Sequence, residues 1–176
     1  MKKILAFAGS NNSKSVHSQL IDFTASLVKD AEVQVLDIRA WDVPMYSIDM
    51  DPDQTPKEIT ELIALIQAHD GFIIGSPEHN GGPSAFLKNI LDWLSRRQKN
   101  AFDSKPVLLL STSPGAGGGA NHLNYFKLAL PYQGATVASS FSLPSFFDNF
   151  KEGKVVDAQL ETLQQSIDKL LAALSE

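Results

Sequence analysis

The chain has 176 residues, of which 43% are hydrophobic and 20% are charged, and it carries a formal net charge of −5. Chains of this size and composition typically form one soluble domain, so we expect residues 1–176 to be a single domain. The acidic balance argues against nucleic acid or an anionic membrane as a partner. The absence of cysteine excludes disulfides and thiol catalysis. No segment reaches the ~20 apolar residues of a membrane span, so we expect a cytoplasmic protein.

The first element is predicted at residues 4–8, a short apolar run typical of a strand buried on both faces. Small polar residues fill positions 9–18, and helical spacing of apolar residues begins at Val16. A helix start offers free N–H groups, a positive dipole end and hydroxyl groups, which together suit a phosphate. Capping of the helix by Ser13 or Ser15 would explain the same residues, and both interpretations stay open.

A second strand is predicted at residues 32–38, where apolar and polar residues alternate. Residues 39–54 form an unusually long loop, typical either of a functional segment or of a solvated surface excursion. The pattern from Thr55 to Glu58 is a capping box with proline at the first helical position. It predicts a helix whose apolar stripe begins at Ile59.

The third strand is predicted at residues 71–75, before a polar loop and an amphipathic helix that reaches Leu94. A fourth apolar run at residues 105–112 leads into the glycine-rich loop 113–119, whose backbone N–H groups could approach a ligand closely. The remaining elements are a helix at 120–129 ended by Pro131 and Gly134, a fifth strand at 136–143, and a last helix with an apolar stripe from Leu160 to Leu174.

Strand and helix therefore alternate five times, which predicts an α/β fold: a doubly wound, five-stranded parallel sheet with helices on both faces. The expected strand order is 2-1-3-4-5, with the switch point between strands one and three. The loops after strands one, three and four would then line one crevice.

Several chemistries do not fit these loops. A dinucleotide fold would carry G-x-G-x-x-G after the first strand, whereas the match at Gly115, Gly117 and Ala120 follows the fourth. A phosphoacceptor receiver would need acidic residues after strands one and three. The histidines are scattered along the sequence without ligand spacing, so no metal site is expected, and the serine-nucleophile motif G-x-S-x-G is missing.

Flavin mononucleotide (FMN) fits better, because it needs a phosphate pocket, loops beside a flat ring and backbone donors for the ring edges. The ring itself accepts and gives the hydride, so we assign no catalytic side chain. Helix-start N–H groups near Gly118 and Gly119 would place positive dipole ends beside the ring and favour its reduced form.

At residues 4 to about 137 the sequence resembles the NADPH-dependent FMN reductases, a family of flavodoxin-like fold that includes quinone, chromate and azo-dye reductases. The most specific piece is Ser76-Pro-Glu-His-Asn80 with Leu87-Lys-Asn89 and Asp92-Trp93, similar to P-E-Y-N…L-K-N-x-x-D-W. The other matching pieces are Gly9-Ser10 with Ser15, similar to G-S-x-R-x-x-S-x-N; Ser113-Pro-Gly115 with Gly118-Gly119, similar to S-P-G-x-x-G-G; and Pro44-Met-Tyr46 followed by Asp49.

The resemblance implies non-covalent FMN, with its phosphate on the first loop, its ring against the second and its pyrimidine edge on the third. It also implies a homodimer or homotetramer that takes a hydride from NADPH or NADH and reduces quinones, free flavins, azo dyes or metal oxyanions. The expected cofactor-binding residues are Ser10, Asn12, Ser15, Val16 and His17; Pro77, Glu78, His79, Asn80 and Gly81; and Ser113, Gly118 and Gly119.

The sequence departs from the family pattern at the cofactor loops. Asn12 stands where the family usually has arginine, and Lys14 is the nearby cation. His17 replaces asparagine, and His79 replaces a tyrosine that lies along the ring. Our hypothesis is an FMN-dependent NAD(P)H oxidoreductase. The alternatives are a flavodoxin-like electron carrier, whose usual T/S-x-T-G-x-T loop is absent here, and a flavin-free binding protein on the same fold.

Overall fold

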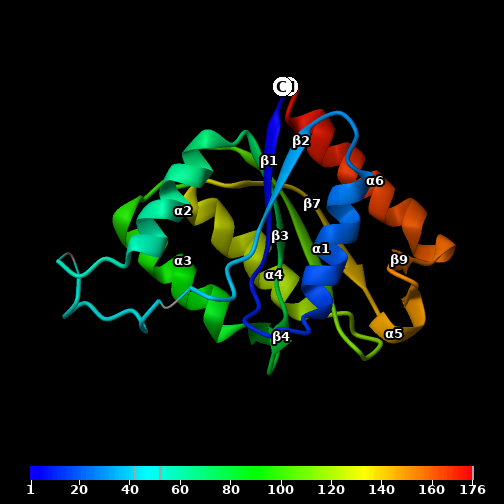
Figure 1. Cartoon of the computed structure of the whole chain (residues 1–176), viewed down its shortest axis with the longest axis horizontal. Helices are drawn as coiled ribbons and strands as arrows, with labels where there is room; N and C mark the ends of the chain where they lie inside the picture. Colours follow the sequence, from blue (N-terminus) through cyan, green and yellow to red (C-terminus); the bar gives the residue numbers. More distant parts are fainter. Residues whose placement is uncertain (42, 52, 176) are drawn as a thin grey trace.

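The computed structural model describes residues 1–41, 43–51 and 53–175, and within these residues five parallel strands form the central sheet (Figure 1). The sheet order is β2-β1-β3-β6-β7, so the predicted order 2-1-3-4-5 is confirmed. The strands are β1 (Lys3–Ala8), β2 (Glu32–Leu36), β3 (Gly71–Gly75), β6 (Pro106–Thr112) and β7 (Thr136–Leu143).

Helices cover both faces of the sheet, as predicted. Figure 1 shows α1 and α6 on one side and α2 and α3 on the other. The helices are α1 (Val16–Leu27), α2 (Lys57–Ala68), α3 (Ala85–Arg97), α4 (Ala120–Ala129), α5 (Phe146–Asn149) and α6 (Asp157–Ala173), with a 3₁₀ helix η1 (Leu130–Gln133).

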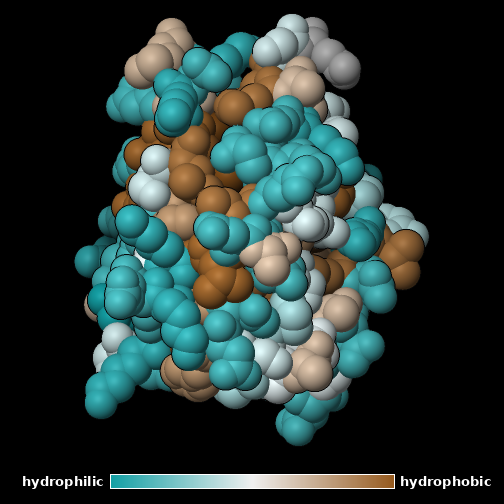
Figure 2. Space-filling model, turned by 90° about the vertical axis from the view of Figure 1, so that its right-hand side faces the viewer, coloured by the Kyte–Doolittle hydropathy of each residue, from teal (hydrophilic) through white to brown (hydrophobic). Residues whose placement is uncertain are grey.

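Alternation along β1 divides the buried residues between two cores. Leu5 and Phe7 pack with α2, α3 and α4, whereas Ile4, Ala6 and Ala8 pack with α1 and α6. Figure 2 shows the side of the molecule on which α1 and α6 lie, where a band of hydrophobic residues runs between hydrophilic ones. The sheet thus forms the rigid centre from which the loops project.

Some elements differ from the prediction. Helix α2 begins at Lys57 with Pro56 as its N-cap residue, so it starts one position later than the capping box predicts. The helix at 120–129 continues through Pro131 as η1, and Gly134 ends it in the left-handed conformation (φ 81°). Proline is tolerated there because its missing N–H lies in the first turn of η1. Two short antiparallel strand pairs and one short helix were not predicted. The pairs are β4 (Glu78–His79) with β5 (Gly82–Pro83) and β8 (Phe150–Lys151) with β9 (Lys154–Val155), and the helix is α5.

The long loop after β2 packs against α3. Asn89 accepts a hydrogen bond from the Tyr46 N–H (2.8 Å) and donates to the carbonyls of Val43 (3.2 Å) and Pro44 (3.0 Å). Trp93 Nε1 also donates to the Pro44 carbonyl (2.8 Å), and its ring meets Tyr46 edge-on at 5.1 Å. This loop is therefore an anchored segment. Asp42 and Pro52, which belong to the predicted loop, lie outside the described residues.

Candidate cofactor site

The three predicted loops leave the same edge of the sheet and contact one another. Ala8 at the end of β1 is in register with Gly75 at the end of β3, and Gly75 with Leu110 in β6. The Gly9 N–H donates to the Gly75 carbonyl (2.6 Å), and the Ser76 N–H to the Leu110 carbonyl (3.2 Å). In Figure 1 this edge lies at the bottom, opposite both termini. The first, third and fourth strands of the prediction thus deliver their loops to one place.

The first loop ends in a capped helix. Ser15 is the N-cap residue of α1, and its hydroxyl accepts the Ser18 N–H (3.2 Å), so the capping interpretation is correct for Ser15. Asn12 accepts the Lys14 N–H (2.9 Å), which closes a turn before the helix. The N–H groups of Val16 and His17 have no hydrogen-bond partner among the described residues. A helix start with two open donors can still accept an anion, and capping and anion binding are therefore compatible.

The side chain of His17 lies beneath this loop. It is buried, and its Nε2 accepts the Thr112 N–H at 3.3 Å, which leaves the ring proton on Nδ1. Burial, assisted by the neighbouring His122 and His79, lowers the pKa of His17 to about 3. The imidazole is therefore a neutral tie between the first loop and β6, and only the backbone of His17 is available to a ligand.

The second loop is a tight hairpin that pairs β4 with β5. Pro77 is buried at its base, and His79, Asn80 and Gly81 are exposed at its tip. Asn80 (φ 54°) and Gly81 (φ 79°) both have positive φ, the pattern of a type I′ turn. The Asn-Gly pair was the sequence signal for this hairpin, and its two-residue strands were too short to show alternation.

Glu78, expected beside the ring, points its carboxylate at the start of α4. It accepts the N–H groups of Asn121 (2.9 Å) and His122 (3.2 Å) and the side-chain amide of Asn121 (3.2 Å). Partial burial alone would raise the pKa of Glu78, but these hydrogen bonds outweigh it and hold the pKa below its usual value. Two helix-start N–H groups that we expected to face a ligand are therefore already bound to Glu78.

Gly118 and Gly119 in the third loop are buried and have positive φ, 59° and 73°. A Cβ on Gly118 would collide with the Ser142 hydroxyl, and one on Gly119 with the Ser111 hydroxyl. The close approach that requires glycine is therefore to the protein's own strands β7 and β6. Ser113, at the start of the loop, is half-buried and donates to the Gly115 carbonyl at 3.0 Å.

Three of the four histidines gather at this edge, which their scattered sequence positions did not indicate. His17 and His122 are buried and His79 is exposed; His122 and His79 lie close enough to lower the pKa of His17, and His79 also lowers the pKa of His122. Across the described ranges, no group of three or more His, Cys, Asp or Glu residues could hold a metal ion.

Sequence reasoning also missed Ser84, which joins the first loop to α3. Its hydroxyl donates to the Gly9 carbonyl (2.6 Å) and accepts the Leu87 N–H (3.1 Å) as the N-cap of α3. A serine three residues before the first residue of an apolar helical stripe, Leu87, is the signal that could have identified it.

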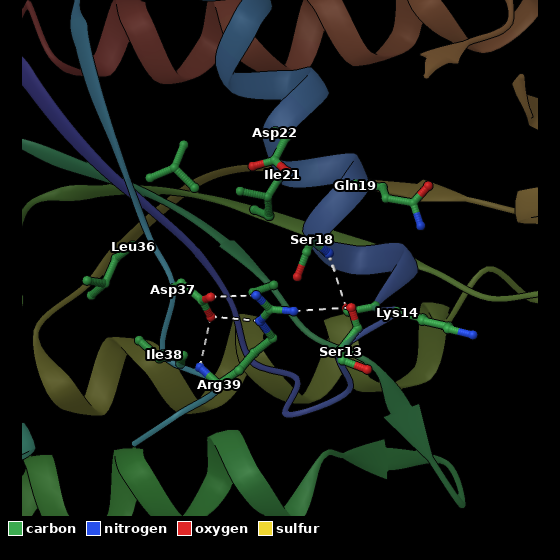
Figure 3. Close-up of a pocket in the computed structure, with 13 residues that line it drawn as sticks. Ser13, Lys14, Ser18, Gln19, Ile21, Asp22, Leu36, Asp37, Ile38 and Arg39 are labelled. Carbon is green, nitrogen blue, oxygen red and sulfur yellow. Dashed lines mark hydrogen bonds and ion pairs between the residues drawn. The ribbon is translucent and has the colours of Figure 1, made fainter. Parts of the chain in front are cut away.

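A cavity of about 280 Å³ adjoins the first loop on its β2 side (Figure 3). Arg39 lies across it, bound to Asp37 through Nε (2.8 Å) and Nη2 (2.6 Å) and to the Ser13 carbonyl through Nη1 (3.1 Å). The hydrogen bonds from Arg39 lower the pKa of Asp37 to about 2. In Figure 3 Lys14 points away from Arg39, so the cation tied to the first loop is Arg39.

The sheet order and the loop cluster define a flavodoxin-like fold of the kind found in flavoenzymes. The solved structure of FerB, a flavoenzyme NAD(P)H:(acceptor) oxidoreductase from Paracoccus denitrificans, has a TM-score of 0.81 and 25% identity, over 99% of this chain and 98% of that one. An NADPH:quinone oxidoreductase of Arabidopsis thaliana is 30% identical over 98% of this chain and 89% of its own length. A quinone reductase of Escherichia coli K12 is 31% identical over 76% of this chain and 71% of its own.

The NADPH-dependent FMN reductase family matches residues 2–148, and the chain belongs to this family. The predicted family, the flavodoxin-like fold and the assignment as an enzyme are confirmed. FMN and a nicotinamide hydride donor are the cofactors of this family, as predicted. Within the part of the chain that the structure describes, no helix has the length and apolar character needed to cross a membrane.

The donors at the sheet edge suit FMN. The unpaired N–H groups of Val16 and His17 match a phosphate, and the exposed hairpin tip with His79 offers an aromatic surface. FMN supplies the electron transfer when it is bound, because its ring can take up and release a hydride.

Proposed function

We propose that this protein holds FMN non-covalently at the carboxyl edge of the sheet and passes electrons from NADPH or NADH to a quinone, free flavin, azo dye or metal oxyanion. The observation that carries the proposal is the open start of α1, where the N–H groups of Val16 and His17 are unpaired and the His17 ring is bound to Thr112, just before the glycine-rich loop. The quinone reductases among the relatives favour a quinone as acceptor.

The proposed contacts divide among the three loops. Ser10, Asn12 and Ser15, with the N–H groups of Val16 and His17, hold the phosphate. Pro77, His79, Asn80 and Gly81 lie along the ring, and Glu78 fixes this hairpin against α4. Ser113, Gly118 and Gly119 form the wall at the pyrimidine edge. These residues bind and orient, and none of them is proposed to react with the substrate.

The proposal is tested with the purified protein by an absorption spectrum, FMN titration and anaerobic reduction with each nicotinamide. We expect a flavin spectrum, bleaching by NADPH or NADH, and steady nicotinamide consumption with a quinone. A flavin spectrum without nicotinamide consumption would indicate the electron carrier instead. Failure to bind FMN at all would indicate the flavin-free alternative.

Replacing Ser15 by Asp is expected to weaken FMN binding at least about tenfold, because a carboxylate would face the phosphate at short range. Aspartate is as good an N-cap as serine, so α1 should keep its start. Ser26→Asp adds the same charge to an exposed position near the other end of α1 and is the matched control. Equal affinities in an FMN fluorescence titration of both variants would contradict the phosphate position.

We also propose that residues 1–176 act as one FMN-binding domain, in the cytoplasm, as a homodimer or homotetramer. Exposed apolar side chains on α4 and η1 support self-association: Leu128 is 74% and Tyr132 is 86% exposed, and Tyr125 lies on the same helix face. Sedimentation velocity should give a multiple of the 19.2 kDa chain mass and a smaller species for Leu128→Asp. A monomeric wild-type protein would contradict this.

A further inference from the structure

His122 is a fully buried imidazole that the contacts described so far do not explain. It lies in the first turn of α4, beside Gly119 and edge-on to Phe126 with ring centroids 5.8 Å apart. Both ring nitrogens are buried and have no hydrogen-bond partner among the described residues. Buried polar atoms are nearly always paired in native proteins, so an unpaired ring at a ligand site suggests a chemical role.

The Glu78 carboxylate is the group best placed to receive a proton from this ring or deliver one. Its Oε2 lies 3.8 Å from His122 Nδ1, which is longer than a hydrogen bond but within ion-pair distance. The Glu78 side chain is 19% exposed, whereas that of His122 is 0% exposed. Glu78 therefore links the buried imidazole to solvent, and a protonated ring could form a charge-assisted hydrogen bond with it.

The other titratable groups that influence His122 also belong to the site. Burial is the largest influence and lowers the pKa of His122. Glu78 and the Gly119 backbone act in the opposite direction, and His79 lowers the pKa further, so the net shift is downward. His17 lies close enough to interact electrostatically, but its own Nε2 is occupied by the Thr112 N–H. His122 is thus neutral before electrons enter the site, and its pKa depends on groups that act in opposite directions. Added negative charge nearby would favour its protonated form.

The proposed reaction needs a proton that the hydride does not bring. In the balance NAD(P)H + H⁺ + quinone → NAD(P)⁺ + hydroquinone, the hydride carries two electrons and one proton, and the second proton comes from solvent. A protein group that takes up this proton when negative charge enters the site would hold it until the acceptor arrives.

We infer that His122 stores this second proton. Its imidazole takes a proton from solvent by way of Glu78 when the nicotinamide's electrons enter the site, and it gives up the proton when the electrons leave with the acceptor. This inference rests on the proposed function. It adds a role for two of the chain's own residues, His122 as the store and Glu78 as the path.

The test uses the FMN-loaded protein and two readouts other than turnover. Ring resonances of His122, assigned by comparison with His122→Asn, are followed by NMR before and after anaerobic reduction with dithionite at several pH values. Proton uptake is measured in parallel with a pH indicator. Wild-type protein should show a protonated His122 ring after reduction and take up about one more proton per two electrons than His122→Asn.

Two further variants make the result specific. Glu78→Gln keeps an oxygen that can accept the α4 N–H groups but removes the charge, so it should lose the protonation of His122 on reduction. If His122→Asn does not fold, the wild-type and Glu78→Gln spectra still decide the question. His69→Gln removes a buried imidazole near the opposite edge of the sheet, where Nδ1 lies 2.6 Å from the Leu65 carbonyl, and should behave as wild type.

A His122 ring that stays neutral on reduction, with equal proton uptake in wild type and variant, would overturn the inference while leaving the proposed function intact. A protein that binds no FMN would instead overturn the proposed function. The initial FMN titration therefore separates the two failures.

Discussion

Lowering the pH from 6.5 to 4 is expected to reduce the free energy of unfolding by about 3 kcal/mol through His17 alone. The folded protein keeps His17 neutral, with a pKa of about 3, because the ring is buried and lies near His122 and His79. The unfolded chain binds a proton near its ordinary value of 6.5, so protons favour unfolding as the pH falls between these two values. The loss is absent at pH values well above 6.5 and complete below about 3.

Urea denaturation at pH 7, 6, 5 and 4 measures this dependence. His17→Gln should flatten it, because a glutamine oxygen can still accept the Thr112 N–H but carries no titrating ring. His69→Gln is the control for loss of a buried histidine elsewhere and should retain the slope that His17 produces. Parallel curves for wild type and His17→Gln would assign the pH dependence to other groups.

Replacing Gly119 by alanine is expected to lower the free energy of unfolding by about 2–4 kcal/mol. The residue has φ 73°, and its new Cβ would collide with the Ser111 hydroxyl on β6. Both the backbone strain and the collision act in the folded state. Thermal or chemical denaturation measures the effect without requiring a ligand.

Gly117→Ala is the matched control two positions earlier. Among the described residues, a Cβ at Gly117 would meet nothing within 4 Å, and the backbone there has no positive φ, so the effect should stay within about 0.5 kcal/mol. Combining Gly119→Ala with Ser111→Gly removes the hydroxyl and should recover part of the loss, leaving the backbone strain. Equal stability of Gly117→Ala and Gly119→Ala would mean that the third loop repacks freely.

The sheet could be predicted because its signals are local and repeated. The runs at residues 4–8, 72–74 and 106–110 are apolar, since both faces of the sheet are covered, and each is followed directly by glycine or serine. Alternation of strands with helices then limits the topology to a few parallel arrangements.

The interior of the candidate site could not be predicted in the same way, because its key contacts join residues far apart in the chain. The bonds from Asn121 and His122 to Glu78 span more than 40 positions, and the bond from Thr112 to His17 spans 95. The spacing of residues along the sequence does not indicate which distant residues will form such contacts. The family resemblance alone therefore placed Glu78 among the cofactor-binding residues, whereas in the folded chain its carboxylate binds the N–H groups at the start of α4.

The anchoring of the loop after β2 gives a structural role to part of the most specific family motif, its residues Asn89 and Trp93. The polar groups of the Asn89 and Trp93 side chains form hydrogen bonds with the backbone of Val43, Pro44 and Tyr46. A related protein that had lost its redox activity would still need both residues to hold the loop after β2 in place. The motif that contains Asn89 and Trp93 would therefore persist after the activity was lost. The N–H groups at the start of α1 make no such contacts within the described part of the protein. Sequence changes in this loop are therefore expected to be the first sign that a relative has lost or changed its ligand.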